Sequence, residues 1–158
     1  MRRKWTFRAN GRLYVLVKRP EEREEHVLMK IFLAHLYGPH YPHLSIEVPY
    51  APEPRYKPDL LALDDHGEAL FWGECGAVSQ KKITTLMQRY PRTHLCFSKW
   101  DTTTRAIESV INNAWSRRKR QPRAPVDLIN FADHHRHQIS RTGTVLLDWS
   151  EVTYQRWS

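Results

Sequence analysis

The chain of 158 residues has few cysteines, few glycines and no long hydrophobic run. Its two cysteines, Cys75 and Cys96, form no metal-binding Cys-x-x-Cys pair, and we expect both to be reduced thiols in a cytoplasmic protein. The sequence contains no Gly-rich phosphate loop, nucleophile elbow or His-Glu-x-x-His pattern. The apolar runs are far shorter than the roughly 20 residues that span a bilayer, and no apolar signal core follows the basic amino terminus. We therefore expect neither membrane insertion nor secretion.

Acidic residues are scarce relative to basic ones. The chain has 25 Lys and Arg against 17 Asp and Glu, a net charge of +8 and a sequence pI of about 9.7. An excess of positive charge favours contact with phosphates, so nucleic acid, DNA or RNA, is the expected partner. One basic group lies at the amino terminus. The other comprises Arg117, Arg118, Lys119, Arg120 and Arg123, and both groups are candidates for holding the nucleic-acid backbone, or else solvated surfaces.

Length and composition predict one folded domain over residues 1–158. Hydrophobic residues make up 41% of the chain and aromatic residues 11%, which is ordinary for a globular protein. We find no internal repeat and no low-complexity tract.

The hydrophobic pattern predicts strands alternating with helices. Strands are expected at residues 12–17, 59–63, 69–75, 94–97 and 126–131, with a possible pairing of 145–147 with 152–154. Helices are expected from Pro20 to just before Gly38, over residues 79–90 and over 102–119. Six of the ten prolines lie between Pro39 and Pro58, which predicts a loop with a short extended piece at 45–48. This order indicates an α/β fold with a mixed central sheet flanked by helices.

Two carboxylates frame the predicted hairpin of residues 59–75. Asp59 opens one strand and Glu74 closes its partner, so both acids are expected at one end. Two facing carboxylates suit Mg²⁺ or Mn²⁺, whose remaining positions are filled by water and phosphate oxygens. Acids at the ends of an isolated hairpin can also be merely exposed. The apolar neighbours of Glu74, which include Trp72, favour burial, and a buried acid needs a partner.

A third acid is expected from the first helix. At about 100° per residue, Glu24 projects on the same side as Leu28 and Ile31, near the middle of the apolar stripe. A carboxylate there is costly unless it points into a polar site, although a first-turn glutamate can also simply interact with the helix dipole.

These features together resemble a known family. A glutamate on the first helix, Pro58-Asp59 and Glu74 follow the layout of PD-(D/E)XK nucleases. The segments RPEEREEHVLMKIFLAHL (residues 19–36) and FWGECGAVSQKKI (residues 71–83) resemble the corresponding segments of the YaeQ family, a compact variant of that fold. The resemblance implies a PD-(D/E)XK nuclease-like core, with Asp59 and Glu74 as metal ligands and Glu24 assisting.

One departure from the family pattern concerns the catalytic lysine. The usual pattern has a lysine two residues after the second acid, whereas this chain has Gly76. The amine must then come from elsewhere, and Lys82 or Lys81 of the following helix are the candidates. Lys82 is preferred because it projects nearer the core side of that helix. Either lysine can alternatively lie on a solvated helix face.

The sequence thus predicts a metal-dependent nuclease that hydrolyses phosphodiester bonds of DNA or RNA. A nucleic-acid-binding module that keeps the nuclease fold without cleavage is the alternative, because of Gly76. A protein-interaction role, with the basic residues only solubilising the chain, is a third possibility.

Overall fold

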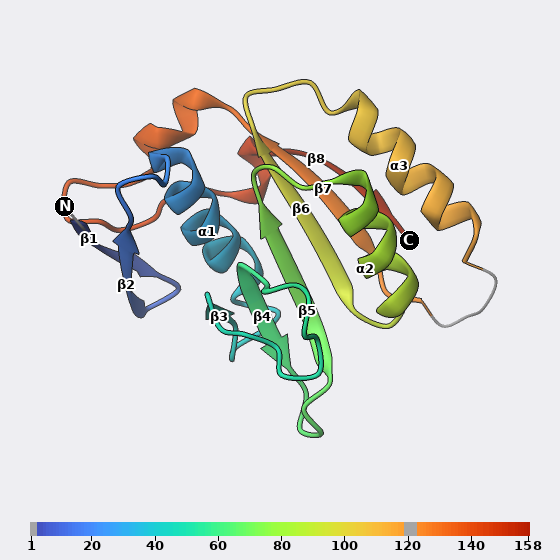
Figure 1. Ribbon diagram of the computed structural model, residues 1–158. Helices are drawn as coiled ribbons and strands as arrows, with labels where there is room; N and C mark the ends of the chain where they lie inside the picture. Colours follow the sequence, from blue (N-terminus) through green and yellow to red (C-terminus); the bar gives the residue numbers. More distant parts are fainter. Residues whose placement is uncertain (1–2, 119–122) are drawn as a thin grey trace.

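The computed structural model describes residues 3–118 and 123–158 (Figure 1). It confirms the predicted α/β class, with eight strands, three α-helices and two short 3-10 helices in the described ranges. The 3-10 helices span Asp133–Gln138 and Trp149–Glu151. The helices are α1 (Glu24–Tyr37), α2 (Gln80–Arg89) and α3 (Arg105–Ser116). The strands are β1 (Arg3–Ala9), β2 (Arg12–Lys18), β3 (Ser45–Ile46), β4 (Leu60–Leu63), β5 (Ala69–Cys75), β6 (His94–Trp100), β7 (Val126–Phe131) and β8 (Thr153–Trp157).

A six-stranded mixed sheet forms the centre of the molecule. Its strand order is β3-β4-β5-β6-β7-β8, with β5, β6 and β7 parallel and the other neighbours antiparallel. Side chains alternate between the two faces of a strand. Phe71 and Cys96 therefore pack toward α1, whereas Trp72 and Leu95 pack toward α2 and α3 (Figure 1).

Helix α1 is buried on two opposite sides. One side packs on the sheet, and the other is covered by the β1-β2 hairpin, whose Phe7 and Leu16 belong to the same core. A helix that is apolar all round is stable only when enclosed in this way. Its one buried cation, Lys30, is 3% exposed and forms ion pairs with Glu22 at 2.6 Å and Glu47 at 2.5 Å, which satisfy its charge.

The structure differs from the sequence-based prediction at both ends of the chain. Strand β1 was not predicted, and it pairs with β2 through a turn at Asn10 (φ 53°) and Gly11 (φ 72°), the left-handed geometry of a tight hairpin. Helix α1 begins at Glu24 rather than Pro20, after a turn. The predicted pairing of residues 145–147 with residues 152–154 is wrong. Strand β8 instead pairs along β7, which offers a ladder over five residue pairs, whereas Val145 makes only an isolated bridge.

Among the described residues, no helix combines the length and the apolar character that crossing a membrane requires.

The enclosure of α1 predicts a large stability loss on truncating Phe32. This side chain is fully buried and packs against Trp100 and Phe131. We expect Phe32→Ala to lower the free energy of unfolding by about 3–5 kcal/mol in urea denaturation. The control is Leu13→Ala, at a position 52% exposed on the hairpin, which should change it by less than about 0.5 kcal/mol. Equal effects of the two substitutions would contradict the burial of α1.

Candidate functional site

Asp59 and Glu74 lie side by side at one end of the β4-β5 hairpin. Leu60 is paired with Gly73, so the next antiparallel pair outward joins Asp59 to Glu74. The backbone N–H of Cys75 donates to Asp59 Oδ2 at 2.8 Å, which fixes the carboxylate against β5. The hairpin therefore brings together the two acids as the sequence pattern predicts.

Glu74 is a buried carboxylate with a single cationic partner among the described residues. It is 5% exposed and faces the α2 side of the sheet. Trp72 Nε1 donates to one carboxylate oxygen at 2.8 Å, and Lys82 Nζ donates to the other at 2.9 Å. Burial raises the pKa of Glu74, the negative charge of Asp59 adds to this rise, and the bond from Lys82 opposes it. The site therefore holds two neighbouring acids, and an amine bonded to one of them.

The amine comes from the first turn of α2. Ser79 caps this helix, and its Oγ accepts a hydrogen bond from the backbone N–H of Lys82 at 3.0 Å. The cap sets the start of the helix, so the side chain of Lys82 turns back to Glu74 and also lies 5.1 Å from the ring centre of Tyr56. Lys81, one residue earlier, is exposed. The structure thus brings Lys82, and not Lys81, to the paired acids.

Glu24 does not join this cluster, and that expectation is wrong. Its carboxylate lies 3.5 Å from Arg136 and is half exposed. It lines a separate hollow beside β1 and residues 140–143. The prediction assumed that α1 has one buried face. Because the hairpin covers the opposite face, a position in the first turn can instead point toward β1.

Glu22 and His26 take the place expected for Glu24. His26 Nε2 lies 3.6 Å from Asp59 Oδ1, and its Nδ1 lies 2.6 Å from Glu22 Oε1. The contact with Asp59 raises the pKa of His26. Glu22, His26 and Lys30 follow one another at four-residue spacing, which places them on one side of a helical path. An acidic residue followed by basic residues at four-residue spacing is the sequence signal that would have identified Glu22 and His26 as site residues.

A cavity of about 700 Å³ opens between α1 and the ends of β5 and β6, and its lining includes His26 and Cys75, which both contact Asp59. His26, Gly76 and Lys99 are among its lining residues. Lys99 Nζ donates to the Gly76 carbonyl at 2.6 Å, and burial lowers the pKa of Lys99. Gly76 has φ +84°, a conformation that is strained for a residue with a side chain. The backbone therefore disfavours a lysine at the position that the family pattern assigns to it.

The second basic group has a structural role in the described part of the chain. Arg118 donates to the Met87 carbonyl at 3.0 Å, and Arg123 donates to the Arg118 carbonyl at 3.0 Å. Both guanidinium groups also lie over the ring of Trp115. Burial, followed by the charge of Arg123, lowers the pKa of Arg118 to about 10. Arg117 is exposed, and Lys119 and Arg120 lie outside the described residues.

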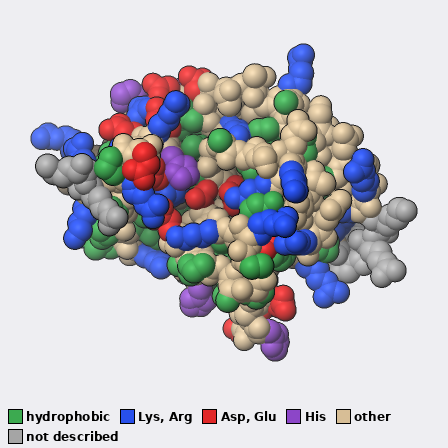
Figure 2. All heavy atoms as spheres, viewed as in Figure 1, with side chains coloured by type: hydrophobic (Ala, Val, Ile, Leu, Met, Phe, Trp, Pro, Cys, Tyr) green, Lys and Arg blue, Asp and Glu red, His purple; other side chains and the backbone are tan. Residues whose placement is uncertain are grey.

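Other basic side chains lie around the paired acids. Figure 2 shows Lys and Arg gathered across the middle of this face, around a smaller group of acidic and histidine side chains. The two hollows beside Asp59 and His26 are lined by five cations: Arg19, Arg23, Lys30, Lys57 and Lys99. Glu21, Glu22, Glu25 and Glu47 line the same hollows, so cationic and anionic side chains both lie around Asp59.

The donor set provides two carboxylates for a metal. No group of three or more His, Cys, Asp or Glu side chains with metal-binding geometry occurs within residues 3–118 and 123–158. Two carboxylates, with water and substrate oxygens, are nevertheless a usual set for Mg²⁺. The pKa of Glu74 is raised by burial and by its acidic neighbour, and a hard cation would relieve both effects. Asp59 and Glu74 thus fit a divalent cation.

Fold and site together define an α/β protein with paired carboxylates at the end of a sheet hairpin. Comparison with protein-family models and with curated proteins gives no match. Among solved structures, the fold is similar to the YaeQ protein from Xanthomonas axonopodis pv. citri, with TM-score 0.52 and 15% identity over 82% of this chain and 72% of that one. The YaeQ protein from Pseudomonas syringae gives TM-score 0.48 and 16% identity over 77% and 73% of the two chains. The first of these likenesses shows that the chain has a YaeQ-like α/β fold.

The ion pair at the site predicts a coupled titration. We expect Lys82→Met to raise the pKa of Glu74 further, because the carboxylate loses its cation while remaining buried. The ¹³C chemical shift of the Glu74 carboxyl carbon, followed against pH, measures this change. Since the folded-state pKa already exceeds the unfolded value, ionisation of Glu74 costs folding free energy, and the variant should lose more stability as pH rises through that pKa. Lys81→Met is the control and should leave the titration unchanged.

Proposed function

We propose that this chain is a diverged member of the YaeQ family with a PD-(D/E)XK nuclease-like core, and that it is a metal-dependent nuclease acting on DNA or RNA. The observation that carries the proposal is the 2.9 Å contact between Lys82 Nζ and Glu74, beside Asp59. Two acids and an amine are the groups that such a nuclease requires, and here α2 supplies the amine that Gly76 lacks. The family likeness in residues 19–36 and 71–83 and the YaeQ-like fold support the proposal.

Asp59 and Glu74 would hold Mg²⁺ or Mn²⁺, which supplies Lewis-acid polarisation of a phosphate oxygen. Lys82 donates to Glu74 from an ammonium that is partly exposed, so it can also donate to a phosphate oxygen or orient a water molecule at the cleft. His26, beside Asp59 and partly exposed, is placed to move a proton at the same cleft. Each of these roles uses a side chain that the structure already positions.

The nucleic-acid backbone would lie over the basic residues around the cleft. Arg19, Lys57 and Lys99 line the hollows beside Asp59, whereas Arg118 and Arg123 are engaged with backbone carbonyls. Phosphate contacts by Lys and Arg supply most of the sequence-independent affinity for nucleic acids. We therefore assign phosphate binding mainly to the surroundings of the cleft, with exposed Arg117 as a further contact.

A cytoplasmic location fits the thiol chemistry. Cys75 and Cys96 are both free and buried. Proteins of reducing compartments keep such cysteines as thiols.

A nucleic-acid-binding module without cleavage is the second candidate. The observation that favours it is that both oxygens of Glu74 already accept hydrogen bonds, from Trp72 and Lys82. A carboxylate held in this way is a weaker metal ligand. In this alternative the same basic surface binds nucleic acid, and Asp59 and Glu74 only organise the end of the hairpin.

Cleavage of end-labelled single- and double-stranded DNA and RNA, with Mg²⁺ or Mn²⁺, separates the two candidates. We expect Asp59→Asn and Lys82→Met to reduce cleavage by about 100-fold or more, the usual contribution of one positioned catalytic group. Lys81→Met should retain activity, because Lys81 is exposed and has no contact with the acids. EDTA should abolish the reaction.

The Asp59→Asn protein, purified in the same way, controls for contaminating nucleases. Absence of cleavage of all four substrates with both metals would refute the catalytic proposal. Retained binding in that case would select the non-catalytic candidate.

Binding itself should depend steeply on salt. In EDTA, the slope of log affinity against log salt should be about −0.9 for each phosphate contacted on duplex DNA. Lys57→Ala combined with Arg19→Ala, at two exposed positions that line the hollow at Asp59, should flatten that slope, and fluorescence anisotropy of a labelled oligonucleotide measures it. The control is Arg92→Ala, an exposed position before β6, which should leave the slope as it is. Affinity that does not change with salt would contradict a nucleic-acid partner.

A further inference from the structure

A second polar cluster lies at the opposite end of α1. Asp127 on β7 is fully buried, and its carboxylate accepts hydrogen bonds from Tyr37 at 2.6 Å, His94 at 2.7 Å and Arg156 at 2.7 and 2.8 Å. Burial opposes its ionisation, but these bonds outweigh burial and lower the pKa of Asp127 to about 2. The cluster is therefore built around a permanently charged carboxylate.

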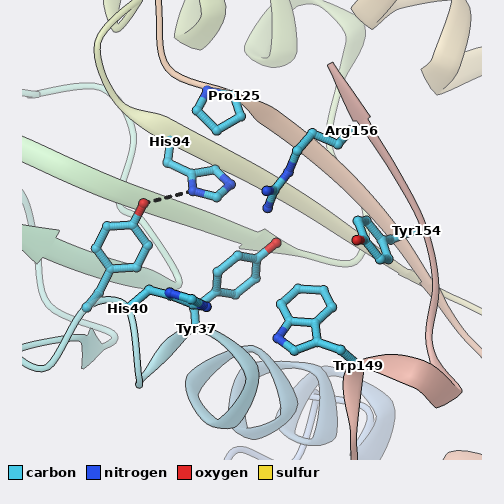
Figure 3. A pocket seen from close by; sticks show the side chains of 8 residues that line it. Tyr37, His40, His94, Pro125, Trp149, Tyr154 and Arg156 are labelled. Atoms are coloured by element: carbon cyan, nitrogen blue, oxygen red, sulfur yellow. Dashed lines mark hydrogen bonds between the residues drawn. The ribbon is translucent and has the colours of Figure 1, made fainter. Parts of the chain in front are cut away.

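The charge on Asp127 fixes the orientation of the residues around it. An ionised carboxylate only accepts hydrogen bonds, so His94 Nε2 must carry a proton. The other ring nitrogen, Nδ1, lies 2.8 Å from the hydroxyl oxygen of Tyr41, the contact drawn in Figure 3. His94 and Tyr41, held by these hydrogen bonds, thus form one wall of the hollow.

Arg156 contributes a cation with one edge still available. Arg156 on β8 lies directly opposite Asp127 on β7. Its Nε and Nη2 atoms donate hydrogen bonds to the Asp127 carboxylate. The guanidinium group has a second edge, formed by Nη1 and Nη2, and Nη1 makes no hydrogen bond with any residue in the ranges 3–118 and 123–158. A free guanidinium edge matches the two oxygens of a carboxylate or phosphate. Figure 3 shows the guanidinium group directed into the hollow, toward Tyr37 and His94.

Aromatic rings complete the walls. The hollow has a volume of about 440 Å³, and Trp149, Tyr154, His40 and Pro125 line it together with the polar cluster. The ring centres of Trp149 and Tyr154 are 5.1 Å apart (Figure 3). Tyr154 is 47% exposed, so part of its surface remains open. Packing within the protein accounts for Asp127, but it leaves the open edge of Arg156 and the exposed part of the Tyr154 ring without an occupant among the described residues.

We propose that this hollow binds a small molecule that combines a planar aromatic ring with an anionic group, either phosphate or carboxylate. The free edge of Arg156 holds the anion, and the ring stacks against Trp149 or Tyr154. The volume is sufficient for a ligand of the size of a nucleoside monophosphate or an aromatic acid.

This pocket is separate from the paired acids. None of its lining residues lines the hollows beside Asp59. Tyr37 ends α1 and His26 lies in its first turn, which at 1.5 Å per residue places them about 16 Å apart. The proposal therefore does not rest on the proposed nuclease function.

Isothermal titration calorimetry in EDTA tests the proposal on the full chain. The probes are AMP, UMP and 4-hydroxybenzoate, which distinguish phosphate from carboxylate as the anion. We expect at least one to bind with a Kd below about 1 mM. Adenosine and inorganic phosphate each carry half of the recognised chemistry and should bind at least about tenfold more weakly than the probe that binds best.

Two variants locate the binding. Arg156→Lys keeps a cation beside Asp127 but lacks the second edge, and Tyr154→Ala removes an exposed ring. Each should weaken binding about tenfold or more, because a bidentate charged contact and a stacked ring each contribute on that scale. Arg105→Lys, at an exposed position on α3, should bind as the parent protein does. Asp59→Asn should also bind normally, which distinguishes this site from the metal cluster.

Three results would overturn the proposal. They are no binding of any of the three probes, undiminished binding by both Arg156→Lys and Tyr154→Ala, and binding of adenosine or inorganic phosphate as tight as that of the best probe. Thermal melting of each variant confirms that it is folded at the temperature of the titration.

Discussion

The enclosure of α1 between the sheet and the β1-β2 hairpin is the constraint on which the rest of the structure depends. Burial on both sides sets the orientation of the helix, and with it the neighbours of the residues at its two ends. At the amino end His26 meets Asp59, and at the carboxyl end Tyr37 meets Asp127. One rigid helix thus organises two polar centres on the same sheet.

The antiparallel register of β4 and β5 is the second constraint, because it sets the two acids beside each other. The chain then turns at Gly76, whose positive φ carries the backbone away from the sheet and into the loop that leads to α2. Since a side chain is strained at that point, the nearest cation is the one that α2 returns to the sheet. The position of Lys82 follows from the backbone geometry of its neighbours as much as from its own chemistry.

Much of the fold was predictable because the spacing of apolar residues within a single strand or helix already indicates which kind of element it forms. The sheet strands from 59 to 131 and all three helices follow directly from it. Strand β1 was missed, although Asn10-Gly11 is a strong hairpin signal. The pairing of Asp59 with Glu74 was predictable because the turn of a hairpin sets its register, and the register places the start of one strand beside the end of the other. Glu24 was misplaced and Glu22 was missed, because the orientation of a helix with two buried sides depends on contacts distant in sequence.

The turn between β4 and β5 projects beyond the body of the protein, away from α1 (Figure 1). It is closed by a hydrogen bond from Asp64 N–H to the Glu68 carbonyl, and nothing lies within 4 Å of a Cβ built on Gly67. His66, at its tip, is exposed. This tip is therefore the natural attachment point for a fluorophore, an affinity tag or a surface linker, since an added group there extends into solvent and leaves both polar centres accessible.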